Sequence, residues 1–284
     1  MVLKTVHLRG CNQNCIFCFK RDNPKKGIDS FEEFVRQIEQ YKNEVDDKKS
    51  LVIEFCSEES TIHPHFLKMI EHLKQENIPF KLISNGRMLS SEKFLEHLIS
   101  RGLISAEISL HSCNKEHQES ITRTKGSYEQ TIKGIENCVK RIPIRVNTVI
   151  CKTNKYDILD TEIMLVENLG VKKVKILGLL GFSCPEGFSH EDILVRYDEI
   201  KDILEKTSDY LESKNIDFCF EHFQPCLLKK NNRYLKIQKI YELNEKDNPK
   251  QPSCSECTKK SSCFGIPRTY TRTFGEFDFE PFLD

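Results

Sequence analysis

The chain has 284 residues, of which 38% are hydrophobic and 30% charged, as in a globular protein with a polar exterior. Its 43 lysines and arginines balance its 43 aspartates and glutamates, so no overall charge draws it to nucleic acid or to a membrane surface. No apolar run approaches the roughly 20 residues that a membrane helix needs, and residues 1–11 lack the apolar segment of a signal peptide. We therefore expect a cytoplasmic protein without a membrane partner.

Short apolar segments alternate with longer amphipathic ones. We expect strands at residues 5–8, 51–56, 80–84, 104–110, 142–150 and 171–180, with a further strand at 216–221. Helices are expected at 30–41, where Ser30 and Glu33 are spaced as a capping box, from Pro64, after Ser90 or Ser91, and at 127–140, 156–169 and 191–213. Repeated βα units predict a parallel sheet covered by helices. Six units fall short of a closed barrel, so the expected fold class is α/β, a partial (β/α)6 TIM-like barrel.

The character of the sequence changes after residue 221. Its periodicity becomes weak, prolines and cysteines become frequent, and lysines gather between residues 229 and 260. We predict two domains, a partial barrel over 1–221 and a small cysteine-rich domain over 222–284 that a metal centre holds together.

Three cysteines stand close together near the start of the chain. The total of 13 cysteines is odd and no export signal is present, which favours metal binding over disulfides. Cys11, Cys15 and Cys18 form C-x3-C-x2-C directly after the first expected strand, at the edge of a βα sheet where active sites are built. A structural zinc site needs a fourth ligand, and residues 19–55 contain no further cysteine. Three thiolates on a cubane iron–sulfur cluster leave one iron open for chemistry.

This pattern, with the aromatic Phe17 before the third cysteine, resembles the radical S-adenosylmethionine (radical SAM) superfamily. The resemblance implies that Cys11, Cys15 and Cys18 hold a [4Fe-4S] cluster whose open iron binds S-adenosyl-L-methionine (SAM). It also implies reductive cleavage of SAM to a 5′-deoxyadenosyl radical that abstracts a hydrogen atom from the substrate. The alternative for these cysteines is a zinc knuckle or a set of incidental thiols.

The same resemblance suggests a set of cofactor-binding residues. Ser57, Glu58 and Glu59 stand where the family has its Gly-Gly-Glu-Pro motif; only Glu59 keeps its identity, and a solvated acidic loop is the alternative. Asn85, in the turn after the third strand, stands where the family lines its SAM pocket. The other candidates lie at or near the ends of later strands, where satisfied core polar groups are the alternative: Ser109, Arg145 or Asn147, and Leu177. His111 fits a structural role better than that of a ligand.

Four cysteines near the other end of the chain can close a metal site. Cys254, Cys257 and Cys263 form C-x2-C-x5-C, and Cys226 completes the set. Four thiolates suit either zinc or a fully ligated [4Fe-4S] cluster, and Cys184 is an alternative ligand. The segment resembles the SPASM and Twitch domains of radical SAM enzymes, which implies a second, auxiliary [4Fe-4S] cluster rather than zinc.

The overall pattern is similar to peptide maturases of the His-Xaa-Ser system type. This similarity implies a peptide or protein substrate, and a reducing partner such as ferredoxin or flavodoxin. No N-terminal extension large enough for a peptide-recognition domain stands before the barrel, so leader binding is expected to use the barrel or a partner protein. The alternatives are tRNA-base modification, to which the basic segment points, small-molecule or cofactor biosynthesis, and a non-catalytic cluster protein.

Overall fold

The strands of the protein form a single parallel sheet whose order follows the chain. The computed structural model describes residues 1–18, 27–56, 58–179, 183–228, 230–236, 249–275 and 280–283. Within these ranges the sheet has eight strands, each paired in parallel with the next. They are β1 (Val2–Val6), β2 (Leu51–Phe55), β3 (Phe80–Ser84), β4 (Leu103–Ser109), β5 (Ile144–Val149), β6 (Lys173–Leu177), β7 (Asp217–Glu221) and β8 (Leu235–Lys236).

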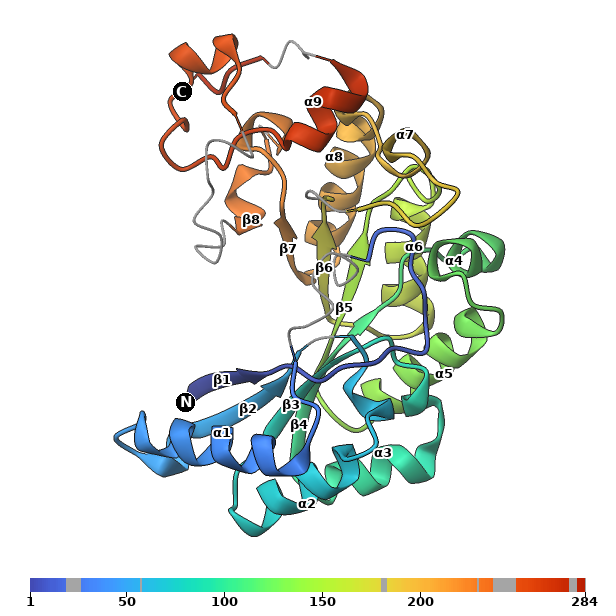
Figure 1. Ribbon diagram of the computed structural model, residues 1–284. Coiled ribbons are helices and arrows are strands. Elements are labelled where there is room, and N and C mark those ends of the chain that lie inside the picture. Colours follow the sequence, from blue (N-terminus) through green and yellow to red (C-terminus); the bar gives the residue numbers. More distant parts are fainter. Residues whose placement is uncertain are drawn as a thin grey trace.

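The sheet curls without closing, and its helices lie along its outer side (Figure 1). In the order of described strands, β1 and β8 are the two edges rather than partners. The helices are α1 (Phe31–Asn43), α2 (Phe66–Gln75), α3 (Glu92–Ile99), α4 (Lys115–Thr122), α5 (Ser127–Val139), α6 (Ile158–Ile163), α7 (His190–Ile193), α8 (Tyr197–Ser213) and α9 (Arg268–Phe274). The expected α/β partial barrel of TIM type is confirmed, with two strands beyond the six expected units.

Several predicted helices differ from the observed ones in detail. The expected helix at 156–169 is α6 followed by a π-helix at Met164–Asn168, and the expected helix at 191–213 is broken between α7 and α8. Short 3-10 helices lie at Lys48–Ser50, Ser60–Ile62, Met88–Ser90, Pro225–Leu228, Asn232–Tyr234 and Pro252–Glu256. No helix in the described ranges is long and apolar enough to cross a membrane.

Helix starts follow the expected capping chemistry where hydroxyls stand before them. Ser30 Oγ accepts a hydrogen bond from the backbone N–H of Glu33 at 3.1 Å at the start of α1. Ser91 does the same for Phe94 at 3.3 Å at the start of α3. A cap of this kind satisfies one of the N–H groups that a helix leaves without a partner in its first turn.

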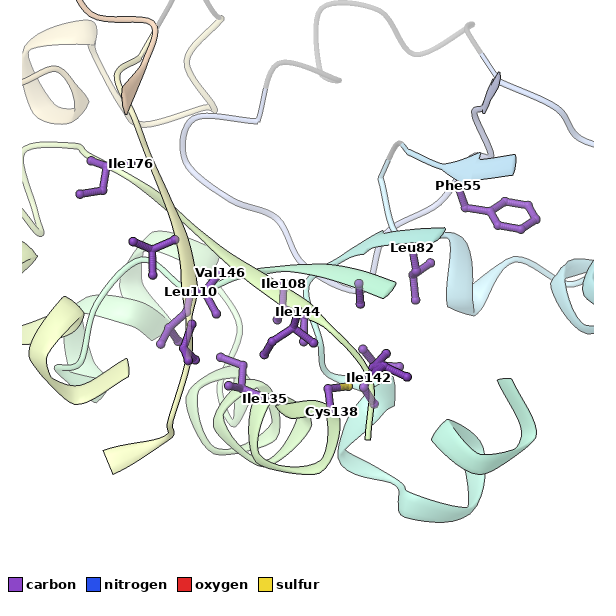
Figure 2. Close-up of a cluster of buried hydrophobic side chains, with 14 of the residues drawn as sticks. Phe55, Leu82, Ile108, Leu110, Ile135, Cys138, Ile142, Ile144, Val146 and Ile176 are labelled. Atoms are coloured by element: carbon purple, nitrogen blue, oxygen red, sulfur yellow. The ribbon is translucent and has the colours of Figure 1, made fainter. Parts of the chain in front are cut away.

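The main hydrophobic core lies between the outer face of the sheet and its helices. Figure 2 shows Ile135 and Cys138 of α5 pointing toward Ile144 of β5, and all three side chains are buried. Burying one large aliphatic side chain stabilises the fold by roughly 1.5–3 kcal/mol. Gly134 lets α5 approach closely, because a Cβ atom there would lie 2.2 Å from the carbonyl oxygen of Gly86. The packing of α5 therefore fixes the turn after β3.

Residues beyond 221 extend the same sheet and the same core. Leu235 of β8 pairs with Phe220 of β7, and Tyr270 of α9 stacks on Tyr197 of α8 with ring centroids 4.1 Å apart. Tyr270 belongs to the main core cluster. A division into domains at residues 1–221 and 222–284 stays a prediction.

Candidate active site

The three N-terminal cysteines lie on a loop that leaves β1 at the carboxyl edge of the sheet. Cys11 is exposed, and Cys15 and Cys18 are half-buried. The loop runs along the end of α4: the N–H groups of Asn14 and Ile16 donate to the carbonyl oxygens of Thr122 and Ile121 at 3.0 and 2.9 Å. These backbone bonds fix the loop independently of its side chains.

The turn after β3 holds the same loop from the other side. Asn85 Nδ2 donates to Asn12 Oδ1 at 2.7 Å, and Arg87 Nη1 donates to the carbonyl oxygen of Asn12. Between them Gly86 has φ +78°, and a Cβ atom there would lie 2.6 Å from Ile108 Cγ2. This left-handed conformation and the tight contact together require glycine. The sequence pair Asn85-Gly86 thus positions the cysteine loop.

Cys11 is exposed as a residue, but its thiol is partly covered and lies near negative charge, an environment that disfavours a thiolate unless a cation such as iron is bound. Burial raises the pKa of the Cys11 thiol to about 11; Glu59 and Cys18 raise it further, and the N–H of Gln13 opposes them at 3.4 Å from Sγ. Cys18 affects the pKa of Cys11 because the two thiols lie close together, as two ligands of one cluster must. No three Cys, His, Asp or Glu side chains in the described ranges are arranged to hold a single metal ion. A cubane cluster, with one iron per thiolate, places its ligands further apart than one ion does.

Phe17 packs against a buried histidine. Its ring meets that of His111 edge-on, with centroids 5.1 Å apart. Burial lowers the pKa of His111 to about 4, so the ring is neutral, and its Nδ1 accepts from the N–H of Val149 at 3.3 Å. These contacts agree with the structural role expected for His111. Beneath Phe17 lies a second apolar cluster that includes Ile16, Ile121 and Cys184.

Glu59 is completely buried between the ends of β2 and β3. Its carboxylate accepts hydrogen bonds from Ser84 Oγ, the N–H of Asn85 and Thr61 Oγ1, at 2.9, 2.7 and 2.5 Å. Burial raises the pKa of Glu59, and these hydrogen bonds oppose that rise. The N–H of Glu59 also donates to the carbonyl oxygen of Gly10 at 2.9 Å. The Glu59 side chain therefore ties its own loop to the end of β3, and its backbone N–H ties both to the start of the cysteine loop.

Ser57 and Glu58 were also predicted for the loop after β2, and the structure describes only Glu58. Glu58 Oε2 accepts from the N–H of Gly10 at 2.5 Å, so this carboxylate contacts the start of the cysteine loop. Ser57 lies outside the described residues.

The remaining cofactor candidates share the inner face of the sheet. Ser109 pairs with Asn147 in register, and Leu177 ends β6. The residues that alternate with them along the strands, such as Ile108 and Val146, belong to the core under the helices. Because successive strand residues point to opposite faces, Ser109, Asn147 and Leu177 face the inside of the curl, as does Arg145.

A carboxylate that the sequence prediction missed organises this inner face. Glu107 of β4 binds Arg145 Nη1 at 3.1 Å, Asn147 Nδ2 at 3.0 Å and Lys175 Nζ at 3.3 Å, and Lys175 also lies 3.4 Å from Glu221 Oε1. Burial acts to raise the pKa of Glu107, but Lys175, Asn147 and Arg145 together hold it below its ordinary value.

Two buried polar atoms of this network lack a partner within the described part of the chain. They are Nε of Arg145 and Oδ1 of Asn147, a donor and an acceptor on adjacent positions of one face. Buried polar groups are normally hydrogen-bonded, and exceptions call for a ligand, a water or an ion.

The four C-terminal cysteines line one hollow of about 330 Å³, its open side included. Cys226 lies in the 3-10 helix that follows β7, while Cys254, Cys257 and Cys263 come from residues 252–263. Burial raises the pKa of the Cys226 thiol to about 12, and the three other cysteines raise it further because they are close. Cys184 is absent from the residues that line this hollow and packs in the apolar cluster beneath Phe17 instead.

A comparison with protein-family models matches residues 5–164 to the radical SAM superfamily. The match covers more than half of the chain and includes the end of β1, the cysteine loop, the Glu59 loop and β2 to β5. The chain belongs to the radical SAM superfamily. It is therefore an enzyme that uses SAM radical chemistry, and the family implies one [4Fe-4S] cluster and SAM.

Curated relatives of this radical SAM enzyme have diverse names. An AdoMet-dependent heme synthase of Methanosarcina barkeri is 25% identical over 153 residues, which are 54% of this chain and 43% of that protein. The subtilosin biosynthesis protein AlbA of Bacillus subtilis is 26% identical over 175 residues, 61% of this chain and 36% of AlbA. A probable GTP 3′,8-cyclase of Methanocella arvoryzae is 24% identical over 252 residues, 78% of this chain and 80% of the cyclase. The chain thus spans less than half the length of the first two.

Solved structures share the fold. The structure of anSMEcpe with bound AdoMet superposes with a TM-score of 0.65 at 14% identity, over 99% of this chain and 94% of that one. Streptococcus suis SuiB bound to its precursor peptide SuiA superposes with a TM-score of 0.60 at 14% identity, over 86% of this chain and 53% of SuiB. At this level of identity the likeness concerns the fold.

The radical SAM site contains residues that motif matching did not predict. Asn12 and Arg87 fix the cysteine loop, and Glu107, Lys175 and Glu221 form the ionic network on the inner face. One signal for the network was present in the sequence. Polar residues alternate with apolar ones at 105, 107 and 109, at 145 and 147, and at 173 and 175, in strands that helices cover on the other face.

Proposed function

We propose that this radical SAM enzyme modifies a peptide or protein by abstracting a hydrogen atom from it. The observation that carries the proposal is the presence of two distinct cysteine sets, a three-cysteine loop after β1 and a four-cysteine hollow after β7. The first set leaves an open ligand position on a cubane cluster and the second does not. When bound, the first cluster supplies the electron that cleaves SAM to methionine and a 5′-deoxyadenosyl radical.

The residues around the first set have separate tasks in this proposal. Cys11, Cys15 and Cys18 hold the catalytic cluster, with Phe17 packed behind them. The backbone of Glu58 and Glu59 and the side chain of Asn85 border the SAM site. Glu59 positions this loop through its buried hydrogen bonds and does not contact SAM with its side chain, because that side chain has no exposed surface.

The inner face of the sheet binds the rest of the cofactor. Arg145, whose side chain is partly exposed on this face, and Asn147 beside it are the groups for the carboxylate or ribose of SAM. Ser109, in register with Asn147, reaches the same groups, and Leu177 flanks the adenine. Glu107 holds Arg145 and Asn147 in place and is a positioning residue.

We propose an auxiliary [4Fe-4S] cluster for the C-terminal hollow, bound by Cys226, Cys254, Cys257 and Cys263. All four thiols line the hollow, yet no three such side chains in the described ranges are arranged around a single ion position. Four thiols at one hollow can hold either a cubane cluster or zinc. The likeness to SPASM and Twitch domains supports the cubane cluster.

Three comparisons support a peptide or protein substrate. AlbA acts in the biosynthesis of a bacteriocin, SuiB was solved with its precursor peptide, and anSMEcpe was solved with AdoMet and a cysteine-containing peptide. Electrons for SAM cleavage would come from a reducing partner such as ferredoxin or flavodoxin.

Biosynthesis of a small molecule or cofactor is the second candidate. The probable GTP 3′,8-cyclase matches over 78% of this chain and 80% of its own length, more than the other two curated relatives. A nucleotide would meet the same inner face, where Lys175 lies beside the SAM network. Modification of a tRNA base is a variant of this candidate.

Hydrogen abstraction can be followed in the cofactor product. The full chain, reconstituted anaerobically with iron and sulfide, is incubated with SAM, dithionite and deuterated test substrates. Three kinds of substrate are tested in parallel: the short peptides encoded beside the gene of this enzyme, GTP, and bulk tRNA. Deuterium transfer into 5′-deoxyadenosine with a peptide, and a mass change in that peptide, is the expected result. Transfer only with GTP or tRNA would replace the peptide by that substrate, and a protein that releases no 5′-deoxyadenosine would contradict radical chemistry.

A further inference from the structure

Two lysines line the four-cysteine hollow together with the thiols. They are Lys250 and Lys260, and the other lining residues are Pro225, Ser253 and Pro281. None of these residues carries a carboxylate, so among the described residues that line the hollow the ionic side chains besides the thiols are the two lysines. A wall of this composition suits a centre that carries negative charge.

Lys250 is fixed in its position. Its ammonium group donates a hydrogen bond to the carbonyl oxygen of Cys263, and the residue is half-buried. A second donor lies nearby, because the N–H of Gly265 points to Cys263 Sγ at 3.4 Å. Lys260 is exposed, so solvent and salt screen its charge more strongly. The basic character of the hollow therefore rests mainly on Lys250.

The charge of the wall bears on electron affinity. A [4Fe-4S] cluster with four thiolates is an anion, and one-electron reduction makes it one charge more negative. Its reduction potential depends on net charge, on hydrogen bonds to the sulfurs and on solvent exposure. A fixed cation and an N–H···S bond both stabilise the more negative state. Each of them raises the potential.

We propose that Lys250, assisted by Lys260, raises the reduction potential of the centre in this hollow and biases it toward accepting an electron. The inference rests on the auxiliary cluster of the proposed function. In this proposal Lys250 acts on the cluster through its charge and is not a ligand of the cluster.

Neighbouring lysines offer a matched comparison. Lys259 precedes Lys260, but its ammonium lies over the ring of Phe282 at 5.3 Å from the centroid and does not line the hollow. Lys250→Met and Lys260→Met remove a charge from the wall, whereas Lys259→Met removes one from outside it. Lys250→Arg keeps the charge.

The test is a redox titration monitored by electron paramagnetic resonance. The full chain is used in a Cys15→Ala background, so that the signal comes from the auxiliary site. At a fixed potential, Lys250→Met should lower the ratio of reduced to oxidised cluster about tenfold, which corresponds to about 59 mV for one electron. Lys260→Met should have a smaller effect in the same direction. Lys259→Met and Lys250→Arg should titrate as the parent does.

The outcomes separate the two proposals. A Cys15→Ala protein that contains no iron contradicts the auxiliary cluster before any potential is measured. A protein with the cluster in which Lys250→Met titrates unchanged overturns the role of the lysine alone. If Lys250→Met fails to assemble its cluster, Lys260→Met decides, because an unchanged potential there also overturns the inference.

Discussion

The backbone N–H of Asn85 donates to Oε2 of Glu59 at 2.7 Å, which ties the end of β3 to the loop after β2. Asn85 in turn binds Asn12 of the cysteine loop through its side-chain amide. Three loops from three strands thus meet around one buried carboxylate. In a parallel barrel such loops gather at the carboxyl edge of the strands, where the chemistry of this fold is performed.

The first prediction concerns that carboxylate. Glu59→Gln places an amide N–H group among the donors that now point at the side chain, and leaves at least one buried donor without an acceptor. Such a loss costs about 1–3 kcal/mol. We expect a lower free energy of unfolding in urea and slower release of 5′-deoxyadenosine.

Glu58→Gln is the matched comparison for Glu59→Gln. Glu58 has a single bond of this network, to the N–H of Gly10, and it is only half-buried. Glu58→Gln should therefore lower the free energy of unfolding less than Glu59→Gln does. Equal losses in the two variants would show that the buried bonds of Glu59 do not organise the site.

The second prediction concerns the network on the inner face. Glu107→Gln removes the negative charge that pairs with Arg145 and Lys175, and loosens the groups proposed to bind SAM. We expect the KM for SAM to rise roughly tenfold, equivalent to about 1.4 kcal/mol of binding. Steady-state release of 5′-deoxyadenosine measures it.

Glu54→Gln controls for the removal of a negative charge from the same face. Glu54 lies on β2, and Glu107 helps to raise its pKa, but its carboxylate does not pair with Arg145. The KM for SAM should stay unchanged in this variant. A rise of the same size in both variants would indicate a general electrostatic effect rather than positioning by Glu107.

The third prediction concerns pH. Glu162 of α6 is fully buried, neither of its carboxyl oxygens has a partner at hydrogen-bond geometry in the described ranges, and burial raises its pKa to about 8. The folded protein keeps this proton, whereas the unfolded chain releases it above the ordinary pKa of glutamate. Stability should therefore fall as the pH rises toward 8, by up to about 1.4 kcal/mol per pH unit from this group.

Urea unfolding across this pH range measures the effect. Glu162→Gln carries no titrating proton and should flatten the dependence between pH 5 and pH 8. Glu167→Gln alters an exposed carboxylate that pairs with Lys214, and should leave the slope in place. A slope that survives Glu162→Gln would assign the pH dependence to another group.

The fourth prediction concerns the cysteine sets. Two cubane clusters require about eight iron atoms per chain. Cys254→Ala should reduce the count to about four and keep SAM cleavage by the first cluster. Cys15→Ala should abolish SAM cleavage while the C-terminal cluster remains.

Cys184→Ala controls for the loss of a thiol, because Cys184 packs beneath Phe17 and does not line the C-terminal hollow. It should retain all of the iron. About four irons with one zinc in the unaltered chain would remove the auxiliary cluster from the proposal, and retained SAM cleavage in Cys15→Ala would remove Cys15 from the catalytic site.

Apolar periodicity predicted the regular elements with small errors at their ends. Strand β3 was predicted at its observed bounds, and β7 began one residue later than expected, but the first strand, expected at 5–8, lies at Val2–Val6. The short strand β8 and the helices α4 and α9 were not predicted. Residues 115–122 are mostly polar, so α4 has little apolar pattern, and its start depends on Asn114, whose side chain accepts from two N–H groups. The two residues of β8 are too few to show a period.

The sequence by itself indicated radical chemistry through its resemblance to the radical SAM superfamily, because the spacing of Cys11, Cys15 and Cys18 after a strand is a local property of the chain. It also determined the alternation of strands and helices, which depends on periods of two and 3.6 residues. Only the tertiary structure decided that Glu59 lies beneath the site, that Glu107 gathers Arg145, Asn147 and Lys175, and that Lys250 faces four thiols. These contacts join residues far apart in the chain, and their distances follow from how the sheet curls and how its loops pack.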